Sequence, residues 1–155
     1  MKADDRCPDY QAMSEDFNLQ RFLDAQHPVF EIVVRELLAG KKATHWMWFV
    51  FPQIRGLGHS STSRFYAISN TEEAKAYIIH PILGNRLREC CEILLDLDGV
   101  TALDIFGDID EQKLFASMTL FTGVTDDNKI FEAILDKYFG GRRHTRTLVL
   151  TGCPC

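Results

Sequence analysis

Apolar residues recur along most of this chain at spacings of three and four, the periodicity of α-helices that bury one face. Proline and glycine fall at the ends of these stripes, where helices start and stop. No pair of alternating strands flanks an Asn-Gly or Asp-Gly turn. The pattern predicts an all-α fold, one compact domain of about seven to nine short and medium helices. The longer ones are predicted near residues 18–27, 28–39, 70–79, 81–98, 108–121 and 127–139.

Several side chains mark where individual helices begin. Asn18 and Asn70 are predicted N-caps, since a short polar side chain accepts a hydrogen bond from the first turn. Thr44 is predicted to cap a short helix through the WMWF run, which Pro52 ends. A strand is the alternative for this run, because neither period leaves it a polar face. Gly107 is predicted to separate a short turn at 101–106 from the next helix.

Composition fits one globular domain rather than a disordered or membrane protein. The chain has 155 residues, of which 46% are hydrophobic and 25% charged. Residues 1–17 are predicted to form a flexible acidic tail, 18–150 the α-helical domain and 151–155 a frayed C-terminus. The N-terminus has no apolar signal core and no run approaches the ~20 apolar residues of a membrane span, which predicts a cytoplasmic protein without membrane contact. A net charge of -5 argues against binding to nucleic acid.

The cysteines and histidines give no metal or cofactor signal. Five cysteines are present, none in a Cys-x-x-Cys pair, and the histidines show no metal-ligand spacing. We predict reduced thiols, with at least one of Cys90 and Cys91 in the core, and no cofactor.

One stretch, THWMWFVFPQIRGLGHSSTSRFY at 44–66, combines aromatic side chains with a Gly-rich, hydroxyl-rich loop. An aromatic wall beside a polar loop is typical of a ligand pocket. Backbone N–H groups of such a loop can hold an anion, with Arg64 as its cation. Trp48 and Phe49 are expected to be mostly buried, although a tryptophan here can also stack on a flat ligand. The candidate ligand-binding residues are His45, Trp46, Trp48, Gln53, Gly56, Gly58, Ser60, Ser63, Arg64, Lys113 and Ser117.

Each candidate also has a structural interpretation. The serines can cap a helix, the glycines can form a turn, and both tryptophans can be core residues. Lys113 and Ser117, four residues apart on one predicted helix, suit an anion site or an activated nucleophile, but a solvated lysine explains the pattern too. No complete catalytic constellation is present, so the sequence leaves open whether the protein is an enzyme.

Four segments in order, HWMWFVFPQ, GLGHSSTSRFYAI, HPILGNRL and KLFASMTLF, resemble a family of small bacterial and fungal proteins described only as a domain of unknown function and sometimes mislabelled calpastatin-like. The resemblance spans about residues 19–150 and implies one mainly α-helical domain without an established activity. This chain has Ala116-Ser117 where the family commonly has two serines. It also has the basic stretch at 142–144 where the family often has an acidic residue.

Three functional hypotheses follow. The first is a binding site for a small molecule or anion, such as a nucleotide or another phosphorylated ligand. The second is a non-enzymatic module that binds a protein partner through charged faces. The third treats the 44–66 stretch as an aromatic core with a capped loop and no ligand.

Overall fold

The computed structural model describes residues 17–152, and within them the all-α prediction is confirmed. The predicted acidic tail, Cys7 and the last three residues lie outside the described part. The helices are α2 (Gln20–Gln26), α3 (Phe30–Leu38), α4 (Met47–Val50), α5 (Ser61–Phe65), α6 (Thr71–Ile79), α7 (Leu83–Asp96), α8 (Ala102–Thr122), α9 (Lys129–Phe139) and α10 (Thr145–Leu150). None of these helices is long and apolar enough to cross a membrane.

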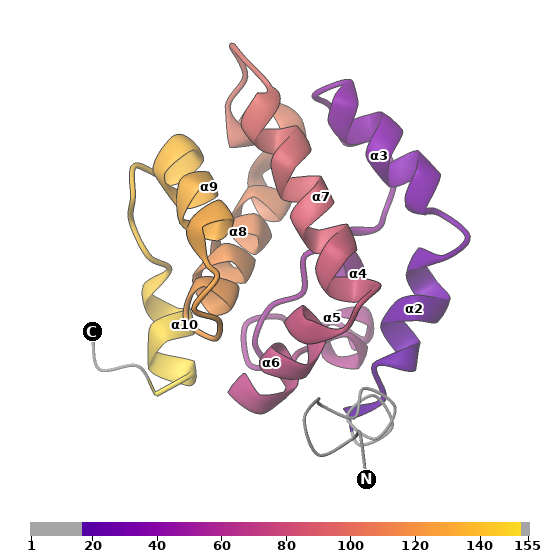
Figure 1. The fold of residues 1–155 in the computed structure, drawn as a ribbon, viewed down its shortest axis with the longest axis vertical. Coiled ribbons are helices and arrows are strands. Elements are labelled where there is room, and N and C mark those ends of the chain that lie inside the picture. Colours follow the sequence, from indigo (N-terminus) through magenta and orange to yellow (C-terminus); the bar gives the residue numbers. More distant parts are fainter. Residues whose placement is uncertain (1–16, 153–155) are drawn as a thin grey trace, which may run out of the picture.

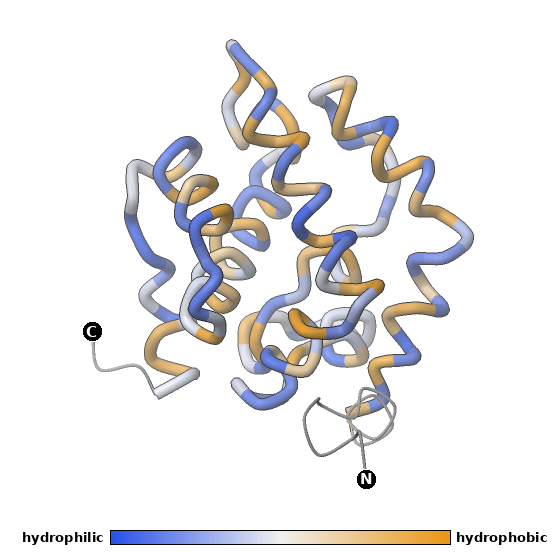
Figure 2. Tube along the Cα trace, in the orientation of Figure 1, coloured by the Kyte–Doolittle hydropathy of each residue, from blue (hydrophilic) through white to orange (hydrophobic). Residues whose placement is uncertain are grey.

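Helix α8 is the central element of the fold. It contacts α4, α6, α9 and α10, and α7 runs across the front of the molecule between α9 and α3 (Figure 1). Eight consecutive residues, 114–121, are buried, so α8 is enclosed on all sides rather than along one stripe. The surrounding helices are amphipathic, and polar and apolar positions interleave along α3 and α7 (Figure 2).

Of the three side chains predicted as N-caps, Asn70 is a cap and Asn18 and Thr44 are not. The Asn70 side chain accepts a hydrogen bond from the Glu73 amide at 2.9 Å, as predicted. Asn18 is no cap: it has a φ of 54°, and α2 begins at Gln20. Thr44 is no cap either, because its amide and hydroxyl donate to the Glu36 carboxylate at 3.1 and 2.7 Å.

The predicted break at Gly107 is a kink inside α8. Gly107 has a φ of 82° and a ψ of 172°, a conformation that L side chains rarely adopt. Just before the kink, the Ile105 carbonyl accepts a hydrogen bond from the Lys42 amide at 2.8 Å. The kink therefore places residues 108–113 beside the segment that joins α3 to α4.

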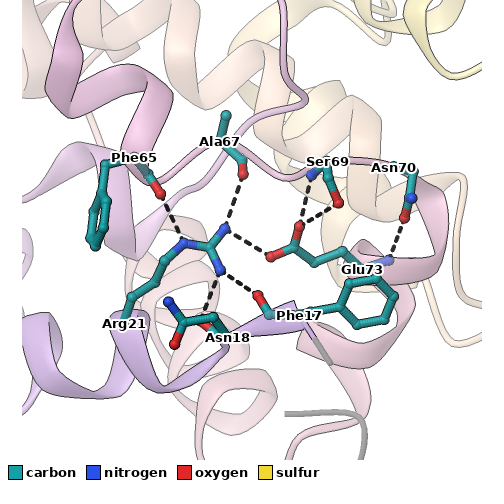
Figure 3. A network of polar contacts seen from close by, with 8 residues as sticks. All are labelled: Phe17, Asn18, Arg21, Phe65, Ala67, Ser69, Asn70 and Glu73. Carbon is teal, nitrogen blue, oxygen red and sulfur yellow. Dashed lines mark hydrogen bonds and ion pairs between the residues drawn. The ribbon is translucent and has the colours of Figure 1, made fainter. Parts of the chain in front are cut away.

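A largely buried ion pair joins α2 to the α5–α6 region (Figure 3). The Arg21 guanidinium lies 2.8 Å from a Glu73 carboxylate oxygen, and the two side chains are 9% and 2% exposed. Arg21 also donates to the carbonyls of Phe17, Asn18, Phe65 and Ala67. All five N–H groups of the guanidinium are used.

The aromatic run divides between core and surface. It forms the short helix α4, not a strand, and Trp46 is 1% exposed. Trp48 and Phe49 are less buried than Trp46, but each exposes well under half of its surface, so the expectation that both are mostly buried is confirmed. They are less buried than their neighbours because one helical turn at the edge of the core turns Met47 and Val50 inward and leaves the two aromatic residues between them at the periphery.

Candidate functional site

The loop between α4 and α6 is closed at its base. The Arg55 amide donates to the Ile68 carbonyl at 2.8 Å, and the Ile68 amide donates to the Gln53 carbonyl at 2.9 Å. These bonds tie the two ends of the loop together. The Gly-Leu-Gly turn and α5 thus form one compact projection from the core.

Inside this loop, Gly58 packs directly against Ser63. A Cβ atom on Gly58 would lie 2.5 Å from the Ser63 Cβ, closer than side chains tolerate. The Ser60 hydroxyl accepts a hydrogen bond from the Ser63 amide at 3.1 Å and lies 3.0 Å from the Ser63 hydroxyl. Ser60 is therefore the N-cap of α5, as the structural interpretation of these serines expects.

A hollow of about 570 Å³, which we call the serine hollow, lies between this loop, α8 and the start of α10. The loop contributes Gln53, Leu57, Gly58, His59, Ser60 and Ser63. The segment after the Gly107 kink contributes Asp108, Ile109, Gln112 and Lys113, and His144 completes the wall. Its volume falls within the range of small-molecule sites, about 300–1,000 Å³.

A second hollow of about 400 Å³, the tryptophan hollow, adjoins the first. Its walls include Lys42, His45, Met47, Trp48, Phe106 and Asp110. Asp108, Ile109 and Lys113 line both hollows. We refer to the two together as the cleft, with Lys113 where its two halves meet.

Two lysines share one carboxylate in the wall of the cleft. Asp110 lies 2.8 Å from the Lys42 ammonium and 3.6 Å from that of Lys113. The side chains of Lys42, Lys113 and Asp110 are 8%, 15% and 19% exposed. Both ammonium groups also lie over indole rings, Lys42 at 5.1 Å from Trp46 and Lys113 at 5.8 Å from Trp48. The two lysines and one aspartate leave this group of three with one net positive charge.

The Glu36 carboxylate fixes the loop that carries Lys42 and Trp46. It accepts hydrogen bonds from the Ala43 amide at 2.8 Å and from the Trp46 indole at 2.9 Å, besides those from Thr44. Burial alone raises the pKa of Glu36, but these hydrogen bonds outweigh it and lower the pKa to about 2. Glu36 is thus ionised at neutral pH and is used to hold the backbone, not to face the cleft.

His144 faces the serine hollow as a neutral donor. Its Nδ1 accepts a hydrogen bond from the Thr147 amide at 3.2 Å, which caps α10 and leaves the proton on Nε2. Burial lowers the pKa of His144, and its ring packs edge-on against Phe115 at 5.3 Å. A neutral imidazole can donate a hydrogen bond to an anionic ligand without competing for charge.

The structure brings seven of the eleven predicted site residues to the cleft. They are His45, Trp48, Gln53, Gly58, Ser60, Ser63 and Lys113.

Four predicted residues lie elsewhere. Trp46 is in the core, and its indole donates to Glu36. Gly56 faces the Leu150 side chain, and Arg64 is exposed and lines neither hollow. Ser117 is fully buried, because α8 is enclosed along this turn, and its hydroxyl is without a hydrogen-bond partner among the described residues.

The cleft also contains residues that were not predicted from the sequence, among them Lys42, Asp108, Asp110, Gln112 and His144. The spacing of three between Asp110 and Lys113 on a predicted helix indicates that the two side chains are neighbours and could have pointed to this ion pair. Nothing in the sequence brings His144 near Ser60, since the two are far apart along the chain. Within residues 17–152, no group of three or more His, Cys, Asp or Glu side chains is placed to hold a metal ion.

Comparison with known proteins identifies a family but no activity. The family described as "Protein of unknown function (DUF1810)" matches residues 16–151. The crystal structure of the conserved hypothetical protein Rv1873 from Mycobacterium tuberculosis is similar, with 50% sequence identity and a TM-score of 0.87. The similarity covers 88% of this chain and 98% of that one. No curated protein matches.

Proposed function

This chain belongs to the DUF1810 family of proteins of unknown function, and we propose that it binds a small anionic molecule in the cleft. Lys113 is the proposed anchor for the anion. Gln53, Ser60, Ser63 and His144 are proposed to supply neutral hydrogen bonds around it.

The observation that carries the proposal is the state of the Lys113 ammonium. The Lys113 side chain is 15% exposed, and the nearest carboxylate oxygen to its ammonium, on Asp110, is 3.6 Å away, beyond hydrogen-bond distance. Asp110 is already engaged at 2.8 Å by Lys42. A charge in a partly buried position without a close partner is unfavourable, and a bound anion would relieve that penalty.

A phosphorylated ligand with a flat group fits the two halves of the cleft. The serine hollow has neutral donors suited to phosphate and sugar oxygens. The half-buried Trp48 ring in the other hollow offers a face on which a base or another planar group can stack. Nucleotides and sugar phosphates are therefore the first ligands to test.

Thermal unfolding in the presence of inorganic phosphate, nucleoside monophosphates and sugar phosphates tests this proposal. A ligand at a hundredfold excess over its Kd stabilises a protein by about 2.7 kcal/mol, which a shift in Tm reports. We expect at least one phosphorylated compound to raise the Tm of the parent protein more than chloride at equal ionic strength does.

Three variants separate binding from a general salt effect. Lys113→Met should abolish the ligand-dependent shift. Asp108→Asn should enlarge it, because this exposed carboxylate lines both hollows and repels an anion. Lys75→Met is the matched control, since Lys75 also pairs with an acidic residue three positions away at 3.6 Å but lies outside the cleft. The proposal would be contradicted if the parent and the three variants showed equal Tm shifts, or if no phosphorylated compound raised the Tm. The 44–66 loop would then have a structural role only.

A further inference from the structure

We propose a second binding site, independent of the cleft, in which Arg86 holds the carboxylate of a small aliphatic acid. A groove of about 570 Å³ lies between α2 and the start of α7. Arg86 stands on one side of it, with Leu23, Pro28 and Ile82 as apolar walls. Nothing in the family description assigns a ligand to this groove.

The Arg86 guanidinium is held in place but mostly unused. One of its N–H groups donates to the Gln26 side-chain carbonyl at 3.3 Å, and the guanidinium carbon lies 4.9 Å from the centre of the Phe30 ring. In the described part of the chain, no second hydrogen-bond acceptor lies within reach of it. A guanidinium has five N–H donors in a planar fork, so four remain for a ligand.

Gln26 determines the position of Arg86. This side chain is 1% exposed, and its amide donates to the Phe49 carbonyl at 2.7 Å and to the Tyr77 hydroxyl at 3.0 Å. Both amide hydrogens point into the core, which leaves the carbonyl oxygen to Arg86. Because Gln26 cannot turn without losing two buried hydrogen bonds, the guanidinium is preorganised for a planar partner.

Gln20, Asp24 and His27 are the other polar residues of the groove, and the carboxylate among them favours a monoanion. Asp24 also lines the groove, and its carboxylate accepts a hydrogen bond from Gln20 at 2.8 Å. A second negative charge on the ligand would face this carboxylate. The fork geometry of Arg86 suits a carboxylate, while Leu23, Pro28 and the 46% exposed Ile82 suit an alkyl chain. The ligand class is therefore a short aliphatic monocarboxylate.

Titration of the 15N-labelled protein with hexanoate tests this site. We expect saturable chemical-shift changes at backbone amides of residues 20–28 and 82–86, with no change around Lys113. Three compounds serve as matched controls. Hexanol has the alkyl chain but no charge, acetate has the carboxylate but no chain, and hexyl phosphate has the chain but carries more than one negative charge. All three should bind at least tenfold more weakly than hexanoate.

Two variants should remove hexanoate binding and one should keep it. Arg86→Met removes the donor, and Ile82→Asp places a carboxylate in the groove at the N-cap of α7, where aspartate is well tolerated. Arg88→Met is the control, because Arg88 also lies over a phenylalanine ring, Phe131 at 5.0 Å, but outside the groove. Equal binding of hexanol and hexanoate, retention of hexanoate binding in Ile82→Asp, or no saturable shift at millimolar hexanoate would overturn the proposal. Loss in both groove variants with retention in Arg88→Met would establish it, whatever the result at Lys113.

Discussion

Two largely buried groups of charges, one around Arg21 and one around Lys113, differ in how far their hydrogen bonds are satisfied. Arg21 uses all five donors, and Glu73 accepts from it with one oxygen and from the Ser69 amide and hydroxyl, both at 2.8 Å, with the other (Figure 3). Lys113 has one partner, at 3.6 Å, which it shares with Lys42. We call the Arg21 group the closed group, because all of its hydrogen bonds are made within the protein. We call the Lys113 group the open charge group, because it carries one net positive charge.

We propose that this difference distinguishes a structural group of charges from one that binds a ligand. A buried charge with every hydrogen bond made within the protein holds elements together and has nothing left for a ligand. A largely buried charge without a close partner destabilises the free protein, and a bound ligand of opposite charge would offset that cost. The Arg21 group joins α2 to α6, and the Lys113 group lines a cleft.

The largest effect is expected from opening the closed group. Arg21→Met leaves the Glu73 carboxylate buried without its cation and should lower the free energy of unfolding by about 3–5 kcal/mol. Urea denaturation measures this loss. Arg21→Met combined with Glu73→Met should recover part of it, since no unpaired charge is then buried. A loss below about 1 kcal/mol in the single variant, as at an exposed ion pair, would contradict the assignment of this group as structural.

Glu36 is expected to show an intermediate effect with a defined pH dependence. Glu36→Gln turns an acceptor of four hydrogen bonds into a group with its own N–H donors and should cost about 1–3 kcal/mol at pH 7. The folded-state pKa is lowered to about 2 from 4.5, so the stabilisation by the carboxylate is present above pH 4.5 and is lost as the pH falls toward 2.

The difference in unfolding free energy between the parent protein and Glu36→Gln should therefore shrink across that window. Asp104, whose pKa is lowered mainly by a hydrogen bond from the Thr101 amide, is present in both proteins and cancels in the difference. A difference that stays constant from pH 5 to pH 2.5 would show that the carboxylate charge is not what holds the loop.

The smallest effect is expected at Ser117, a buried polar residue that lies outside the cleft. Its hydroxyl is buried and has no hydrogen-bond partner within residues 17–152, but unlike Lys113 it lies inside the core and lines neither hollow. Ser117→Ala should raise the free energy of unfolding by about 1 kcal/mol and leave any phosphate response unchanged. Destabilisation, or loss of a ligand response, would mean that this hydroxyl has a role that its position does not account for.

Sequence predicted the fold well because helix ends are local. The Asn70 cap, the kink at Gly107 and the left-handed Gly140 after α9 each follow from a few neighbouring residues. The predicted cap at Thr44 fails because a tertiary contact overrides local preference, since the Thr44 hydroxyl donates to Glu36. The predicted cap at Asn18 fails because Asn18 has a left-handed backbone conformation and α2 begins two residues later.

The cleft was only half predictable. The 44–66 stretch contains six of the cleft residues that were predicted, and the unusual composition of this stretch is the signal. The other wall comes from α8 and His144, which join it only through the kink and through packing of α10. Lys42 was missed because a lysine in a polar segment is normally solvated. Lys42 is buried here beside the Asp110 carboxylate, and that pairing joins residues far apart in the sequence.

The most direct test of the open charge group is the side-chain NMR signal of Lys113 during titration with inorganic phosphate. The signal is assigned by its loss in Lys113→Met, and sodium chloride at matched ionic strength is the reference. We predict that the Lys113 Nζ and Cε resonances shift saturably with phosphate, while those of the exposed Lys75 follow only the ionic strength. Equal, non-saturating shifts at the two lysines would contradict the account.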